Sequence, residues 1–74
     1  MKLNELQSGQ NGRILKISAK EKLYQKLLDM GFINGAIITV VREAPLYDPM
    51  ELKIHNYLVS LRKSEANLIQ VELI

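Results

Sequence analysis

The stretch MELKIHNYLVSL, residues 50–61, alternates apolar and polar side chains on both sides of a two-residue connection. Leu52 and Ile54 fall on one face of the first half, and the second half repeats the alternation, as in half-buried β-strands. Asn56 accepts a left-handed backbone more readily than most residues, so His55 and Asn56 suit a tight turn. The stretch therefore predicts a β-hairpin, and β structure is the starting point for the fold.

Three more short strands are predicted around this hairpin. The β-branched run within 35–42 is apolar on both sides, which is typical of a central strand. In 68–74, Ile69, Val71 and Leu73 share one face, opposite Gln70 and Glu72. The remaining short elements are a strand at 13–17, a single helical turn at 3–6 and a turn or helical turn at 62–67.

One segment, 18–30, predicts a true helix. Ser18 and Glu21 have the spacing of a capping box, in which each side chain accepts a hydrogen bond from a backbone amide at the helix start. Gly31 follows at the position where a left-handed residue commonly ends a helix. The apolar side of this helix is formed by Leu23, Leu27 and Met30, with Tyr24 and Leu28 beside them.

Five short strands with short connections predict a sheet that closes on itself, because closure removes exposed strand edges. The predicted fold is mainly β, a small SH3-like β-barrel with an inserted α-helix. With 74 residues the chain has room for one domain, 1–74. It contains no cysteine, so neither a disulfide nor a cysteine-ligated zinc can stabilise this small core.

Charge and hydropathy exclude several classes of protein. The net charge is only +2, whereas a dedicated nucleic-acid binder normally has a dense cluster of basic residues. The first residues lack the apolar region of a signal peptide, and no apolar run reaches the ~18 residues needed to span a membrane. A cytoplasmic protein that reaches a membrane only through a partner is the expectation.

Catalytic and metal-binding patterns are not found. The chain has one histidine, His55, without a nearby partner in sequence for a nucleophilic triad. Glu43, Asp48 and Glu51 could join it around a metal, but one histidine cannot complete the usual transition-metal sets. The two glycine pairs also lack the context of a phosphate-binding loop. We expect no enzyme activity, cofactor or metal site, with metal binding kept as the alternative.

We expect that so small a core does not bury all of the apolar side chains near the helix end. Apolar surface that stays exposed usually marks a protein interface, although burial of all these side chains in the core is an equal alternative. The predicted interface is a groove between the helix end and the proline-containing loop after the central strand. Its apolar members are Met30, Phe32, Leu46 and Tyr47, with Lys26 and Arg62 at the rim.

The order of several motifs resembles the ferrous iron transport protein A (FeoA) family along nearly the whole chain. The matching pieces include 27–32 (Leu-Leu-Asp-Met-Gly-Phe), Gly35, 44–49 (Ala-Pro-Leu-Tyr-Asp-Pro) and 61–66, with Ile69 and Val71 near the end. The resemblance implies the SH3-like fold and a small cytoplasmic bacterial protein. It also implies a partner, the cytosolic G-protein region of the membrane iron transporter FeoB, which the protein would bind and modulate.

Departures from the family pattern are few. Asn34 replaces a usual proline, Asn56 a frequent glycine, and 24–26 lack the arginines of many members. The same barrel follows a helix-turn-helix domain in metal-dependent repressors. Because this chain begins at Met1 without such a domain, a stand-alone accessory protein is expected, with iron delivery, a regulator domain and nucleic-acid binding as alternatives. A weak homodimer through an unpaired edge strand is a further possibility, and the sequence leaves open which strand that is.

Overall fold

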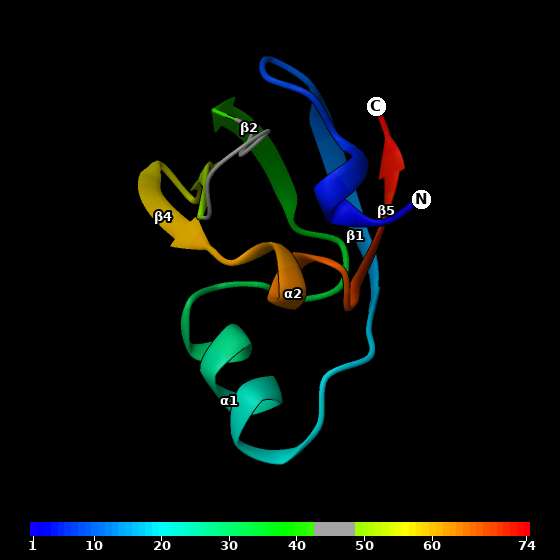
Figure 1. The fold of residues 1–74 in the computed structure, drawn as a ribbon, viewed down its shortest axis with the longest axis vertical. Helices are drawn as coiled ribbons and strands as arrows, with labels where there is room; N and C mark the ends of the chain where they lie inside the picture. The colour runs from blue at the N-terminus through cyan, green and yellow to red at the C-terminus, as the bar shows by residue number, and fades with distance from the viewer. Residues whose placement is uncertain (43–48) are drawn as a thin grey trace.

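The computed structural model describes residues 1–42 and 49–74, which form one antiparallel sheet with short helices around it (Figure 1). The strand order is β4-β3-β2-β1-β5, so the predicted central strand, β2, lies in the middle. The strands are β1 (Asn11–Ile17), β2 (Ile37–Arg42), β3 (Met50–Ile54), β4 (Tyr57–Leu61) and β5 (Ile69–Leu73). The helices are the 3-10 turn η1 (Leu3–Glu5), α1 (Glu21–Asp29) and α2 (Lys63–Ala66).

The predicted hairpin is confirmed as β3 and β4. Its five cross-strand pairs run from Ile54 opposite Tyr57 to Met50 opposite Leu61. His55 and Asn56 have φ values of 50° and 69°, as a two-residue type I′ turn requires. The turn matches the twist of the flanking strands, which explains why local sequence alone sets the register here.

The sheet does not close into a barrel, which corrects one part of the predicted fold. β4 and β5 lie at opposite edges of the sheet and do not pair with each other. The chain passes between them through α2, whose Ala66 is fully buried. A helical turn packed on the core therefore occupies the connection where a closed barrel would need strand pairing (Figure 1).

The core is formed by the inner face of the sheet together with one or two residues from each helical element. Leu3, Leu6, Leu27 and Phe32 pack there from outside the sheet, and all are almost completely inaccessible to solvent. The sheet contributes alternate residues: Ile14, Ile38, Val40, Met50, Leu52, Ile54, Leu61, Ile69 and Val71. None of the core side chains is polar or charged among the described residues.

The helix α1 begins later than the sequence predicts. The Ser18 N–H donates to the Leu68 carbonyl at 2.8 Å, which ties this residue to the strand side of the molecule. Lys20 precedes the helix with extended backbone, and no side chain caps the first turn. The predicted capping box of Ser18 and Glu21 is therefore wrong. The predicted end is confirmed, because Gly31 has a φ of 97°.

Two strand-end residues are exposed although they share a face with buried residues. Tyr57 begins β4 and is 43% exposed, and Leu73 ends β5 with 53% of its surface exposed. Alternation predicts which face a side chain takes, but the core does not extend to both ends of every strand. Among the described residues, none of the helices has both the length and the apolar character to cross a bilayer.

Candidate partner-binding surface

The end of α1 is the region where the sequence places its predicted groove, and the structure sorts the six predicted residues. Lys26 and Arg62 are exposed, Met30 is half-buried and Phe32 is fully buried, with 0% exposure. Leu46 and Tyr47 lie outside the described residues. The groove as predicted therefore needs one correction, at Phe32.

Phe32 belongs to the core and not to the exposed surface. After the left-handed Gly31, the Phe32 N–H donates to the Leu27 carbonyl at 2.9 Å, so the chain folds back against the helix. Its ring then packs in the hydrophobic cluster. Burying an aromatic side chain removes more apolar area from water than burying its neighbour would, which favours Phe32 for this position.

Ile33 takes the exposed position that the sequence assigned to Phe32. Its exposed fraction is 46%. Tyr24, on α1, is also exposed. Their apolar character was visible in sequence, but nothing local distinguishes Ile33 from Phe32 as the outward residue.

Glu65 links the predicted rim residue Lys26 to the backbone at the other, Arg62. Its Oε2 lies 3.4 Å from Lys26 Nζ, and its Oε1 accepts the backbone N–H of Arg62 at 3.1 Å. The Glu65 side chain is only 16% exposed, whereas that of Lys26 is 60% exposed. The carboxylate therefore holds α1 against the start of α2 and leaves both cationic side chains facing solvent.

The turn of the β3–β4 hairpin contacts the backbone at the end of α1. The Tyr57 hydroxyl donates to the Met30 carbonyl, and His55 Nε2 lies 3.2 Å from the Gly31 carbonyl. The Met30 carbonyl belongs to the C-cap of α1, and the Gly31 carbonyl follows it and also accepts the Ile33 N–H at 3.0 Å. The hairpin therefore fixes the helix end beside the predicted interface.

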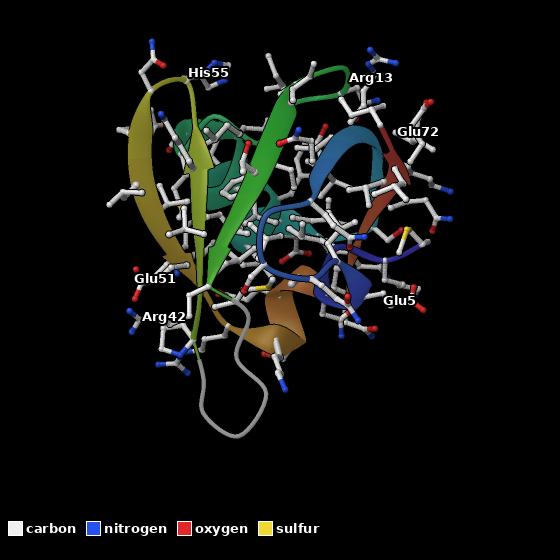
Figure 2. The ribbon with its side chains drawn as sticks, turned by 90° about the horizontal axis from the view of Figure 1, so that it is seen from above. Glu5, Arg13, Arg42, Glu51, His55 and Glu72 are labelled. Carbon is white, nitrogen blue, oxygen red and sulfur yellow. The ribbon has the colours of Figure 1, made fainter. Side chains whose placement is uncertain are left out.

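Of the four residues considered for a metal site, the structure describes His55 and Glu51, and these two lie apart. His55 stands at the hairpin turn, whereas Glu51 lies near the other end of the hairpin beside Arg42, with 3.8 Å between Arg42 Nη1 and Glu51 Oε1 (Figure 2). Glu43 and Asp48 are outside the described residues. Within 1–42 and 49–74, no three histidine, cysteine or acidic side chains gather in a way that could hold a metal ion.

The outer face of the sheet carries an apolar residue that the sequence did not select. Leu58, on β4, is 64% exposed, the largest value among the exposed large apolar side chains of the described residues. It stands opposite Lys53 of β3 in the hairpin. The alternation of β4 already indicates that Leu58 points outward, and this was the available signal.

Comparison with known proteins places the chain among iron transport proteins. Residues 1–73 match the family model described as the FeoA domain. The chain is 43% identical over its whole length to part of the Fe(2+) transport protein A/Fe(2+) transporter FeoB fusion protein of Porphyromonas gingivalis, spanning 9% of that protein. It is 32% identical to the putative Fe(2+) transport protein A of Campylobacter jejuni, with full coverage of both chains.

Solved structures agree with the fold. The solution structure of iron(II) transport protein A from Clostridium thermocellum superposes with a TM-score of 0.94 at 44% identity, covering all of this chain and 46% of that one. The zinc complex of Stenotrophomonas maltophilia FeoA, described as a prokaryotic SH3 domain protein, gives a TM-score of 0.85 at 24% identity, covering 97% of this chain and 89% of that one. The SH3-like class is therefore confirmed, with an open sheet.

Proposed function

The chain belongs to the FeoA family, and on that premise we propose that it is an accessory protein of ferrous iron uptake. In this proposal it binds the cytosolic G-protein region of a FeoB-type transporter and modulates it, without catalysing a reaction itself. The fusion protein of Porphyromonas gingivalis is the observation that supports this most directly, since its A part and its FeoB part form one polypeptide. Two modules joined in one chain stay at high effective concentration, which favours an interaction between them.

We place the protein in the cytoplasm as a single domain over 1–74, reaching the membrane through the transporter. The proposed contact surface lies at the end of α1 and the start of α2. It combines the rim cations Lys26 and Arg62 with the half-buried Met30 and the exposed Ile33, which replaces Phe32. Leu46 and Tyr47 stay in the proposal as predictions from sequence.

This combination has the character of a protein-binding surface. Apolar side chains supply contact area once water is excluded, while exposed cations at the rim guide association and orientation. The Glu65 carboxylate pairs with Lys26 and accepts the backbone N–H of Arg62, and both cationic residues stay exposed. An acidic patch on the G-protein region is the matching chemistry.

An amide NMR titration of the labelled protein with the isolated G-protein region tests the proposal. We expect shifts confined to 26–33 and 62–66, extending to 46–47 if the whole predicted groove takes part. Shifts elsewhere, or none at saturating concentration, contradict the proposed surface. A parallel anaerobic titration with ferrous ion separates the alternative, because iron delivery predicts shifts around His55 with iron alone.

Paired variants with equal charge changes sharpen the test. Lys26→Ala with Arg62→Ala removes both rim cations, and the control, Arg13→Ala with Lys16→Ala, removes the same charges from β1. We expect about a tenfold loss of affinity, or about 1.4 kcal/mol, for the rim variant only. An equal loss in both would mean that net charge alone drives binding, and no loss in either would exclude the rim.

A further inference from the structure

β4 is an edge strand without the features that usually protect such an edge. It is the outermost strand on its side, and no other strand of the described residues pairs with its free side. Native edges commonly carry charged side chains, proline or a bulge. β4 reads Tyr-Leu-Val-Ser-Leu and has none of these, whereas each of the other four described strands includes at least one charged residue.

The register of the hairpin shows which backbone groups are free. In a two-residue turn the Tyr57 N–H bonds to the Ile54 carbonyl, and bonded pairs then alternate with non-bonded pairs along the strands. Tyr57, Val59 and Leu61 therefore direct their backbone groups toward β3. Leu58 and Ser60 direct theirs away from the sheet, which leaves two N–H donors and two carbonyl acceptors open for a further strand.

We propose that β4 pairs in antiparallel fashion with β4 of a second copy of this chain, with Val59 on the two-fold axis. Leu58 of each copy then stands opposite Ser60 of the other, so that the outward donors and acceptors of both strands are satisfied. The two five-stranded sheets become one continuous sheet. This proposal does not depend on the proposed function.

The charges of β3 alternate in a way that fits this register, although they lie one strand away from the contact and Glu51 already stands 3.8 Å from Arg42. Across the hairpin, Lys53 is opposite Leu58 and Glu51 is opposite Ser60, and all four share the outer face. With Val59 on the axis, each row across the dimer has Lys53 of one copy at one end and Glu51 of the other copy at the other end. Shifting the axis to Leu58 puts the two Lys53 residues in one row, and shifting it to Ser60 does so for the two Glu51 residues.

The opposite face of the strand also fits a second copy. Val59 is half-buried, and on the axis it stands directly against Val59 of the second copy in a non-hydrogen-bonded pair, where side chains approach closely. Pairs of β-branched side chains in this position stabilise a sheet. A contact between two five-residue strands is far smaller than the ~1,200 Å² of a stable interface, so the dimer is weak and depends on concentration.

Cysteine cross-linking reads the register directly, because the natural chain has no cysteine. Residues in a non-hydrogen-bonded pair have Cα atoms ~4.5 Å apart, which a disulfide can span. We expect Val59→Cys to form a disulfide-linked dimer under mild oxidation much faster than Leu58→Cys or Ser60→Cys. Faster linkage at either control position, or equal rates at all three, would contradict the register.

Sedimentation from micromolar to millimolar concentration tests the association itself without cross-linking. We expect the natural chain to dimerise reversibly, Leu58→Lys to remain monomeric, and the control Leu15→Lys, which alters an exposed leucine of β1, to dimerise as before. A chain that is monomeric throughout, or a Leu58→Lys variant that dimerises as well as the natural chain, would overturn the proposal, as would binding of the G-protein region along β4 in place of the second copy.

Discussion

The two edges of the sheet differ in whether another segment of the chain covers them. At the β5 edge, the N-terminal segment lies alongside the strand, with the Val71 N–H bonded to the Met1 carbonyl at 2.7 Å and Met1 N bonded to the Val71 carbonyl at 3.1 Å. Lys2 adds an isolated bridge to Gln70. The β4 edge has no such cover among the described residues. One small domain can therefore protect one edge with its own chain and leave the other available for binding.

The covered edge is stable because its cover is anchored in the core. Leu3, the first residue of η1, and Leu6, which follows it, are among the most buried side chains of the described residues. Their burial anchors the segment in addition to the hydrogen bonds of Met1, and the segment runs beside β5 (Figure 1). The open edge is attached differently, through contacts of Tyr57 and His55 with the end of α1.

The largest effect is expected from removing the anchor of the cover. Leu3→Ala should lower the free energy of unfolding by about 2–5 kcal/mol, since it leaves a cavity under the N-terminal segment. It should also increase hydrogen exchange at the Val71 amide, whose acceptor is Met1. Denaturant unfolding and exchange NMR measure the two effects.

Leu15→Ala is the matched control for that variant. Leu15 is an exposed leucine on β1, and its truncation should change stability by no more than about 0.5 kcal/mol. If Leu3→Ala costs as little as this control, or leaves the Val71 amide protected, the β5 edge does not depend on the core anchor. The contrast between the edges would then rest on backbone pairing alone.

A smaller effect is expected where the hairpin contacts α1. Gly31 has a φ of 97°, and an added Cβ would lie 2.7 Å from His55 Cδ2 and 2.8 Å from the Tyr57 hydroxyl oxygen. Gly9 has a similar φ of 87°, with nothing within 4 Å of an added Cβ. Both Gly→Ala variants should cost about 1–3 kcal/mol from backbone strain, with the larger loss at Gly31.

The difference between the two glycine variants isolates the hairpin contact. Thermal or denaturant unfolding of both gives this difference directly, and amide shifts at Tyr57 and Leu58 should change only in the Gly31 variant. Equal costs at the two positions would mean that the hairpin moves aside freely. The open edge would then lack any fixed attachment to the helix.

The hairpin shows what sequence could predict. Its bounds of 50–54 and 57–61 follow from alternation and a two-residue turn, which are local features that act within a dozen residues. The end of α1 at the left-handed Gly31 likewise follows from the local sequence. The outward direction of Leu58 also follows from alternation, although the sequence gives no reason to single it out.

Closure of the sheet and the candidate surface depend on contacts between distant segments. Whether β4 meets β5 is decided by how α2 packs, and whether Phe32 or Ile33 turns inward is decided by the core beneath α1. Similarly, Lys26 is linked to the backbone of Arg62 only through Glu65 of a later helix. Periodicity predicted a region for the surface, but it does not decide which of two neighbouring apolar residues is buried.

The smallest effect is expected from the ion pair that lies on the β5 side. Arg13 Nη1 and Glu72 Oε1 are 3.8 Å apart, and their side chains are 45% and 48% exposed, so solvent screens the attraction (Figure 2). A double-mutant cycle with Arg13→Ala and Glu72→Ala should give a coupling of about 0.2–0.5 kcal/mol that falls further in high salt. A coupling above about 1 kcal/mol would show that side-chain charge helps to stabilise the β5 edge, in addition to the anchored N-terminal segment. The absence of charged residues on β4 would then explain more of the difference between the two edges.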